Sequence, residues 1–490
     1  MKLAELIENI PDIDSPSLSI SPNITGLTED SRRVTPGMLF AALSGTKSDG
    51  MNFAQEAVRG GAAAILGGPQ TSVHQFPVPI LSAGNPRRAF ALLAARFYAL
   101  QPETIAAVTG TNGKTSVASF LRQIWAAIGF EAASLGTIGI VTARGTAPLS
   151  HTTPDPVTLH SHLAELARAG VTHLALEASS HGLDQHRLDG VRITAAAFTN
   201  ITRDHLDYHR TFEDYLNAKL RLFTELLPPN APAVIDADSP GAEAAISAAK
   251  SARLSVFTTG ERGRDISLKT VRAAGFGQHL ALTYRGKEFN VELPLAGTFQ
   301  VSNALLAAGL AISLGARASL VFGTLSDLRG AKGRLEYCGE TAEGAPVFVD
   351  YAHTPDALIK ALQALRPAVS KRLHVVFGCG GDRDKGKRPE MGRAAAAHAD
   401  VVYVTDDNPR SEDPAAIRRD IMAAAPGATE IASRAEAIAT AIAGLKNGDA
   451  LLIAGKGHET GQIIGHTIIP FSDQETAAAV LAAVRAVSNA

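Results

Sequence analysis

A glycine-bounded turn between an apolar run and an amphipathic run is the strongest chemical signal in the sequence. Residues 105–108 predict a buried strand, and apolar residues recur at helical spacing from Val117 to Ile128. Between them stand the candidate phosphate-binding residues Gly110, Thr111, Asn112, Gly113, Lys114, Thr115 and Ser116. The N–H groups of such a turn and the start of the helix attract phosphate. Lys114 would reach the β- and γ-phosphates of a nucleotide, and the Thr115 hydroxyl would bind Mg²⁺.

This turn departs from the usual phosphate loop at one position. The pattern has a glycine five residues before Gly113, and Val108 stands there instead. An ordinary strand–turn–helix therefore remains the alternative.

Two later segments supply candidates for the same site. Glu177 ends an apolar run, where a carboxylate is placed to hold Mg²⁺, an ion that takes few protein oxygens together with water and phosphate. The segment 199–209 contains Asp204, His205 and Asp207, whose spacing fits no zinc site. His205 is a second possible magnesium contact, although histidine is an uncommon ligand for so hard an ion. The alternative for Glu177 is a carboxylate satisfied within its own loop.

Lys219 lies on the helix predicted after this segment. It shares a helix face with apolar residues, so by itself it indicates a surface lysine whose stem lies along apolar side chains.

Three charged loops follow predicted strands in the last third of the chain. In the glycine-rich loop 378–389, Arg383, Lys385, Lys387 and Arg388 could clamp an anion, as arginine does with carboxylate and phosphate. The alternative is a solvated loop.

The other two loops predict a site for a zwitterion. Asp407 and Asn408 could meet an ammonium group while Arg410 meets a carboxylate, although Asn-Pro alone indicates an ordinary β-turn. Gly455 permits close approach of the backbone to a ligand, and Glu459 offers a second ammonium partner.

The elements that must position these residues form an α/β pattern. A length of 490 residues predicts about three domains, and we place them at residues 1–101, 102–336 and 337–490. Strands and helices alternate as in doubly wound sheets, where ligands bind at the carboxyl ends of the strands. The predicted elements near the candidate residues include strands 172–177, 191–198, 280–284 and 288–293 and helices 157–169, 212–226 and 300–314.

Composition narrows the class of protein. A net charge of −2 argues against binding of nucleic acid or of an anionic membrane surface as the main function. The two cysteines rule out a multi-bridge disulfide framework and indicate a reducing compartment. The N-terminus is no signal peptide, and no apolar run reaches membrane-spanning length. We expect a soluble cytoplasmic protein.

Taken together, the motifs resemble those of the Mur ligases, the ATP-dependent enzymes that form amide bonds in peptidoglycan synthesis. The likeness is closest to the members that add 2,6-diaminopimelate, and it runs through residues 30–32, 110–115, 151–154, 177–183, 185–187, 203–209, 350–356, 378–389, 407–410 and 455–459. This family itself uses the shorter phosphate loop Gly-Thr-Asn-Gly-Lys-Thr. The resemblance implies three α/β domains: a central doubly wound sheet of the P-loop type that binds ATP, an N-terminal substrate domain and a C-terminal Rossmann-like domain.

The resemblance also implies roles for individual residues. The UDP-N-acetylmuramoyl dipeptide would contact Ser31, Thr46, Lys47, Ser48, Thr152, Thr153, Ser179, Gln185 and Arg187. ATP would contact Asn303, Arg334 and Asp350 besides the phosphate loop. Mg²⁺ would be held by Thr115, Glu177, His205 and Lys219, the last as a carbamate, which reverses the surface interpretation. Catalysis would rest on Lys114, Glu177, His205 and Lys219. Meso-diaminopimelate would contact Arg388, Asp407, Asn408, Pro409, Arg410, Gly455 and Glu459.

The activity that the resemblance implies is amide ligation by a monomer. ATP would phosphorylate the D-glutamate γ-carboxylate, and the amine of diaminopimelate would attack the acyl phosphate. Family members that add lysine typically lack the arginine found here as Arg410. The alternatives are a lysine-adding relative, a ligase like folylpolyglutamate synthase, which would lack the uridine-binding N-terminal domain, and a phosphate-loop ATPase or nucleotide switch, which needs no amine.

Overall fold

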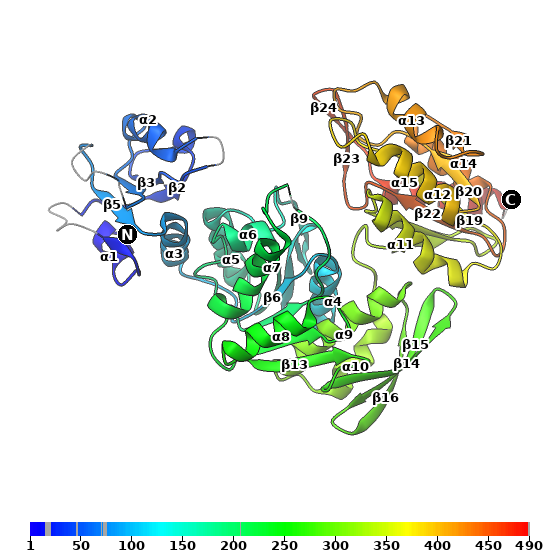
Figure 1. The fold of residues 1–490 in the computed structure, drawn as a ribbon, viewed down its shortest axis with the longest axis horizontal. Helices are drawn as coiled ribbons and strands as arrows, with labels where there is room; N and C mark the ends of the chain where they lie inside the picture. Colours follow the sequence, from blue (N-terminus) through cyan, green and yellow to red (C-terminus); the bar gives the residue numbers. More distant parts are fainter. Residues whose placement is uncertain (15–20, 46–47, 70, 72–75, 206, 489–490) are drawn as a thin grey trace. The chain divides into compact units, whose positions relative to one another are not determined.

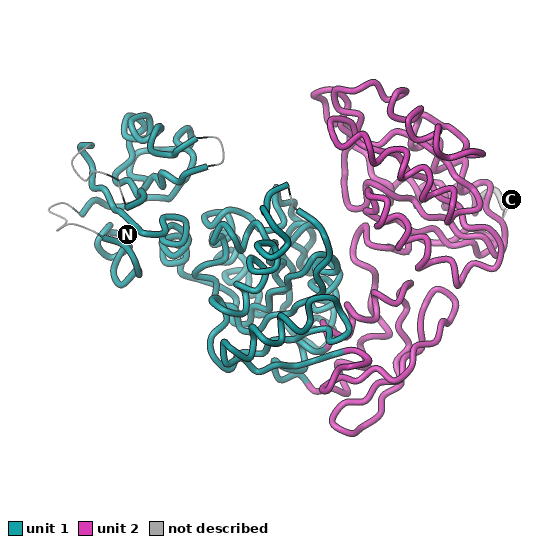
Figure 2. Tube along the Cα trace, in the orientation of Figure 1, with its two compact units in different colours: residues 1–259, 309–316 teal, residues 260–308, 317–490 magenta. Residues whose placement is uncertain are grey.

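The computed structural model describes residues 1–14, 21–45, 48–69, 71, 76–205 and 207–488. Its chain divides into two compact units, which Figure 2 shows in teal and magenta. The first unit holds residues 1–259 and 309–316, and the second holds residues 260–308 and 317–490. Among the described residues, no helix combines the length and apolar character needed to cross a membrane.

The N-terminal part of the first unit is a small α/β fold (Figure 1). Its sheet has the order β1-β5-β4-β3-β2, and only β1 runs antiparallel to its neighbour. Asn85 caps the longest helix by accepting a hydrogen bond from Arg88 N. The elements are α1 (Leu3–Ile7), β1 (Ile13–Asp14), β2 (Gly26–Thr28), β3 (Met38–Ala41), α2 (Ala54–Arg59), β4 (Ala64–Gly67), β5 (Ile80–Ala83) and α3 (Pro86–Tyr98).

The rest of the first unit is built on a sheet that is parallel over most of its width. The strand order is β13-β12-β11-β6-β10-β7-β8-β9, and only β8 and β9 are antiparallel to their neighbours. The central strand β6 has a run of fully buried apolar residues, as expected when helices cover both faces of a sheet. The elements are β6 (Thr104–Thr109), α4 (Lys114–Ala127), β7 (Ala132–Gly136), β8 (Gly139–Thr142), β9 (Gly145–Ala147), α5 (Pro156–Arg168), β10 (His173–Glu177), α6 (Ser180–Asp184), β11 (Ala195–Phe198), α7 (Phe212–Arg221), β12 (Pro232–Asp236), α8 (Ala242–Ser251) and β13 (Ser255–Gly260).

Two predicted elements of this unit differ from the structure. The strand predicted over 191–198 is only β11, because Arg192 N donates to the side chain of Gln101 instead of joining the ladder. The helix predicted over 212–226 begins as expected, with a capping box between Thr211 and Asp214. Its last turn, however, is the π-helix Leu222–Leu226.

The second unit begins with an antiparallel meander of three strands, β14 (Ile266–Ala274), β15 (Gly277–Tyr284) and β16 (Lys287–Leu293). The sequence predicts β15 and β16 but not β14. Helix α9 (Thr298–Ser313) begins two residues before the predicted start, and α10 (Ala318–Thr324) follows it.

A mostly parallel sheet forms the C-terminal part of the second unit. Its order is β17-β18-β22-β19-β20-β21, with only β17 antiparallel. Strands β18, β19, β20 and β22 end at the same edge, where the predicted ligand-binding loops begin. The elements are β17 (Glu336–Glu340), β18 (Pro346–Asp350), α11 (Pro355–Leu365), β19 (Leu373–Phe377), α12 (Lys387–His398), β20 (Val401–Val404), α13 (Pro414–Met422), β21 (Thr429–Glu430), α14 (Arg434–Ala443), β22 (Ala450–Ala454), the hairpin β23 (Gly461–Ile464) and β24 (Thr467–Pro470), and α15 (Asp473–Ser488).

Candidate active site

The predicted phosphate loop joins β6 to α4 and is fixed by the segment that follows β11. Gly110 and Gly113 have φ angles of +143° and +88°, which favour glycine. A Cβ atom on Gly110 would lie 1.9 Å from the Thr199 hydroxyl. Thr111 N donates to Asn200 O over 2.8 Å, and Asn112 N donates to Asn200 Oδ1 over 3.1 Å. These contacts fix the conformation of the loop.

Two lysines meet at the carbonyl of Gly110. Lys114 Nζ donates to Gly110 O and Thr111 O, each over 2.9 Å, and Lys219 Nζ donates to the same Gly110 O over 2.8 Å. Lys219 is 1% exposed, and its Nζ lies 4.4 Å from the centre of the Tyr215 ring. The interpretation of Lys219 as a surface lysine is wrong, because the amine is enclosed between this ring and the phosphate loop.

Burial changes the chemistry of Lys219. Loss of water lowers the pKa of its amine well below the ordinary value, and repulsion from Lys114 lowers the pKa further. A neutral amine is the nucleophilic form that can add carbon dioxide and become a carbamate anion. The environment of Lys219 therefore fits the carbamate that the resemblance implies.

Thr115 and Glu177 are brought together as the magnesium prediction requires. Thr115 Oγ1 donates to Glu177 Oε2 over 3.0 Å, and the N–H of Thr137 donates to Glu177 Oε1 over 2.8 Å. Glu177 is 2% exposed, and within the described part of the chain it has no cationic partner. A buried carboxylate with only uncharged donors around it fits a cation ligand.

The substitution Gly136→Ala tests the placement of this carboxylate. The new Cβ would lie 2.1 Å from Glu177 Oε1, so either the carboxylate or β7 must move. We expect turnover to fall on the order of 10- to 100-fold and the Mg²⁺ concentration at half-maximal rate to rise. A Mg²⁺ titration of turnover measures both effects. Gly323→Ala, at a helical glycine with open space around it, is the matched control. Unchanged magnesium dependence in Gly136→Ala would contradict a metal role for Glu177.

The His205 ring lies near two aromatic rings, those of His181 and Tyr215. Its ring lies 5.0 Å from that of His181 and 6.0 Å from that of Tyr215, the residue that covers Lys219. Burial, with repulsion from His205 and His209, lowers the pKa of His181 to about 4. The structure thus places His205 beside Tyr215, no hydrogen bond or ion pair joins it to Glu177 among the described residues, and its magnesium role stays a prediction.

Most residues predicted to hold the acyl substrate form one network around the end of β10. Thr153 Oγ1 donates to Glu177 O and accepts a bond from Ser179 N. Arg187 donates to Thr153 O over 2.7 Å and to the Gln185 amide oxygen. Thr152 shares a hydrogen bond of 2.9 Å with the hydroxyl of Thr137, which in turn bonds to Glu177. These residues are therefore contiguous with the magnesium cluster.

The remaining predictions for this substrate fall in the first 101 residues. Ser31 is half-buried at the start of a 3₁₀ turn, where its hydroxyl donates to Glu56 over 2.9 Å. Ser48 is exposed. Thr46 and Lys47 lie outside the described residues.

The three residues predicted to contact ATP outside the phosphate loop lie near one another in the second unit. Asn303 donates to Gln300 over 2.9 Å, and Gln300 donates to the carbonyl of Arg334. The Arg334 guanidinium lies 5.0 Å from the centre of the Tyr351 ring. Burial raises the pKa of Asp350, and Arg334 opposes that rise. Asn303, Arg334 and Asp350 thus belong to one polar cluster.

The predicted zwitterion site is also assembled in the second unit. Asn408 Oδ1 accepts bonds from Lys456 Nζ over 3.1 Å and from Ile463 N over 2.9 Å, and its Nδ2 donates to Glu459 Oε2. Lys456 Nζ also donates to Glu459 Oε2 over 2.9 Å. The Asn408 oxygen and Glu459 Oε2 each accept two bonds already, so an ammonium group would meet the Asp407 carboxylate and the other oxygen of Glu459. Asp407 is 8% exposed, and among the described residues no cation lies within ion-pair distance of it.

Arg410 is held where the loops 378–389 and 405–410 touch. Its Nη1 donates to Gly381 O over 2.6 Å, and its backbone, with φ +51°, bonds to Ile463. The contact needs glycine, since a Cβ on Gly381 would lie 2.0 Å from the Pro409 carbonyl. A Cβ on Gly455 would lie 2.7 Å from Asp407 Oδ2. These glycines allow the predicted ligand residues to converge.

Arg388 forms ion pairs with two carboxylates of the protein itself. Its side chain is 2% exposed, and it donates to Glu412 over 2.8 Å and to Asp420 over 3.0 Å. Glu412 in turn accepts from Asp382 N, so Arg388 fixes the loop 378–389. The contact of Arg388 with the amine substrate stays a prediction.

Sequence reasoning missed two contributors to these sites. Thr137, the residue that follows β7, holds Glu177, and Lys456 joins Asn408 to Glu459 from a fully buried position. Lys456 lies between two glycines, Gly455 and Gly457, which was the one local sign that its backbone approaches other segments closely.

Comparisons with known proteins agree along the whole chain. The family models described as "Mur ligase family, catalytic domain", "Mur ligase middle domain" and "Mur ligase, glutamate ligase domain" match residues 23–98, 108–311 and 333–457. A UDP-N-acetylmuramoyl-L-alanyl-D-glutamate--2,6-diaminopimelate ligase from Bradyrhizobium diazoefficiens is 58% identical over 486 residues, which are 98% of this chain and 99% of that protein. The same-named protein from Brucella melitensis is 56% identical over 460 residues, 94% of each chain.

A solved structure gives the same result for the fold. A solved structure of a protein with that name superposes on this chain with a TM-score of 0.74. The two sequences are 34% identical, and the match covers 100% of this chain and 99% of the other. Its fold is the three-domain α/β architecture that the motifs imply. With matches of this length and identity in both sequence and structure, the chain belongs to the Mur ligase family.

Proposed function

We propose that this chain is an ATP-dependent ligase that adds meso-2,6-diaminopimelate to the D-glutamate of UDP-N-acetylmuramoyl-L-alanyl-D-glutamate, in peptidoglycan precursor synthesis. The observation that carries the proposal is the zwitterion site, in which the carboxylates of Asp407 and Glu459 lie in one loop cluster with the guanidinium of Arg410. Relatives named as UDP-N-acetylmuramoyl-L-alanyl-D-glutamate--2,6-diaminopimelate ligases match over nearly the full length. We assign the uridine nucleotide end of the acyl substrate to residues 1–101, its muramoyl-dipeptide part and ATP chiefly to residues 102–336, and the amine to residues 337–490, in a cytoplasmic monomer that uses neither nucleic acid nor a membrane.

The first step is transfer of the γ-phosphoryl group of ATP to the D-glutamate γ-carboxylate. Lys114 leaves the carbonyls of Gly110 and Thr111 and meets the phosphate oxygens, while the loop N–H groups hold the β-phosphate. Thr115, Glu177, His205 and the Lys219 carbamate would hold Mg²⁺, which supplies neutralisation of the phosphate charge. Asn303, Arg334 and Asp350 would contact the rest of the nucleotide.

The second step is attack of the amine on the acyl phosphate. The amine nitrogen bonds to the γ-carbonyl carbon, the tetrahedral intermediate collapses, and phosphate leaves with one oxygen of the original carboxylate. Holding the amine in a preformed site lowers the barrier by proximity. Asp407 and Glu459 bind the ammonium group at the distal end of diaminopimelate, and Arg410 binds the carboxylate at that end.

An isotope experiment tests the proposal. With ATP, Mg²⁺ and a dipeptide substrate carrying ¹⁸O in its γ-carboxylate, we expect a product heavier by one diaminopimelate residue and phosphate carrying one ¹⁸O atom. Unlabelled phosphate would contradict the acyl phosphate, and an unchanged dipeptide mass would contradict the ligase.

Arg410→Ala is expected to change the choice of amine. L-Lysine has a distal ammonium group but no distal carboxylate, so only diaminopimelate loses a partner. We expect kcat/KM for diaminopimelate to fall on the order of 100-fold and that for lysine to change little. Arg410→Lys is the matched control, because it has the same backbone preference at φ +51° and retains charge without the planar fork. An Arg410→Ala enzyme that kept the original preference would contradict the assignment.

A further inference from the structure

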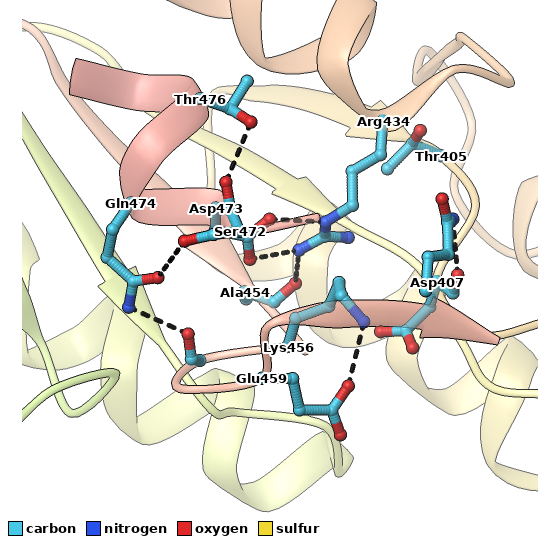
Figure 3. Close-up of polar contacts among 12 residues, drawn as sticks. Thr405, Asp407, Arg434, Ala454, Lys456, Glu459, Ser472, Asp473, Gln474 and Thr476 are labelled. Atoms are coloured by element: carbon cyan, nitrogen blue, oxygen red, sulfur yellow. Dashed lines mark hydrogen bonds and ion pairs between the residues drawn. The ribbon is translucent and has the colours of Figure 1, made fainter. Parts of the chain in front are cut away.

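A fully buried ion pair lies beneath the loop that carries Lys456 and Glu459. Arg434 begins α14 and Asp473 begins α15, and both side chains are 0% exposed. Arg434 Nε donates to Asp473 Oδ1 and Arg434 Nη2 donates to Asp473 Oδ2, each over 2.7 Å (Figure 3). The fork of the guanidinium is thus matched by both carboxylate oxygens.

The same guanidinium reaches the end of a central strand. Arg434 Nη2 also donates to Ala454 O over 2.9 Å, and Ala454 is the last residue of β22. Gly455 follows with φ +116°, and Lys456 comes next. Figure 3 shows the guanidinium between Asp473 and the segment from Ala454 to Glu459. Arg434 therefore fixes the point at which this loop leaves the sheet.

The start of α15 holds the loop at a second point. Gln474, next to Asp473, donates to Gly457 O over 2.9 Å. Thr476 Oγ1 donates to Ser472 O over 2.8 Å, which secures the first turn of the helix. The ion pair and Gln474 together tie the loop at both sides of Lys456.

The charge of Arg434 also acts on the site itself. Burial alone would lower the pKa of Arg434, but attraction to Asp473, and beyond it to Asp407 and Glu459, raises the pKa above its ordinary value. Its Nη1 is buried without a hydrogen-bond partner among the described residues. A positive charge is thus fixed in range of the two carboxylates that face the amine.

The stability of the fold does not by itself explain why a buried ion pair is present at this position. Taking both charges out of water costs much of what their attraction returns, and apolar residues of similar volume often stabilise a core equally well. The position of the loop is a stronger reason, because Lys456 and Glu459 both depend on it.

We propose that Arg434 is a positioning residue for the amine substrate: clamped by Asp473, it holds Ala454 so that Lys456 and Glu459 keep their places beside Asp407. This inference rests on the proposed ligase function, since it assigns the residue to the amine step.

The test replaces the pair without leaving a lone buried charge. In the double variant Arg434→Met/Asp473→Val, we expect KM for diaminopimelate to rise on the order of 10- to 100-fold. The KM values for ATP and for the UDP-dipeptide should stay within about twofold, and the melting temperature should stay close to that of the parent. Arg434→Lys keeps the charge but loses the planar fork of the guanidinium. Its KM for diaminopimelate should lie between those of the parent and the double variant.

Asp449→Asn is the matched control. Asp449 is also buried, but it lies at the opposite edge of the same sheet, where it pairs with Arg372 over 3.3 Å. We expect this variant to lower the melting temperature without changing KM for diaminopimelate. A folded double variant with unchanged KM for diaminopimelate, or with all three KM values raised alike, would overturn the inference alone. A parent enzyme that needs no amine would overturn the proposed function, and this inference with it.

Discussion

Lys219→Met is expected to lower kcat on the order of a thousandfold while leaving the protein folded. The methionine side chain fills a similar volume in the enclosed space between Tyr215 and Gly110, and it introduces no buried charge. It cannot form a carbamate, so an anion that supports magnesium is lost from the phosphoryl-transfer step. Turnover at saturating ATP, dipeptide and amine measures the effect, and thermal unfolding checks the fold.

The carbamate itself has a direct signature. Burial lowers the pKa of the Lys219 amine, which favours the neutral form that reacts with carbon dioxide. With ¹³C-bicarbonate, we expect a carbamate carbon signal in the parent and none in Lys219→Met. Lys360→Met, which removes an exposed helix lysine paired with Asp356, should retain both signal and turnover. Near-parent turnover in Lys219→Met would contradict the role of the residue.

Lys114→Met is expected to lower kcat by roughly two to three orders of magnitude, the loss typical of removing one preorganised donor from a developing negative charge. Its ammonium group is held by two carbonyls of the phosphate loop. Single-turnover measurement of acyl phosphate formation isolates the affected step.

Two controls separate charge from position at Lys114. Lys114→Arg keeps the charge on a bulkier group, and it should recover part of the rate if charge is what matters. Binding of the UDP-dipeptide should be unchanged in both variants, because its predicted contacts lie elsewhere. Equal losses of dipeptide binding and of rate would indicate a collapsed loop instead.

Features that depend on residues close together in the sequence, or on the shared edge of parallel strands, could be predicted. The strand, turn and helix around residues 105–128 are visible from apolar spacing and from Gly110 and Gly113, and the structure confirms them. Glu177 could be placed beside Thr115 because carboxyl ends of parallel strands share an edge. The loops after β19, β20 and β22 converge for the same reason.

Long-range contacts could not be predicted in the same way. Lys219 has the spacing of a surface lysine, and only its bond to Gly110, 109 residues away, shows that it is buried. In strand β14 only Ile266 is buried, and polar residues interrupt its apolar ones, so no continuous apolar run reveals the strand. The pairing of Arg434 with Asp473 joins two helix starts that neither spacing nor composition connects.

Phosphate release from ATP tests the central claim most directly. The assay contains the UDP-muramoyl dipeptide and compares meso-diaminopimelate, L-lysine and no amine. We predict turnover with diaminopimelate only. Turnover with lysine would retain the ligase but contradict the role of Arg410, and turnover that ignores the amine would contradict the ligase in favour of an ATPase.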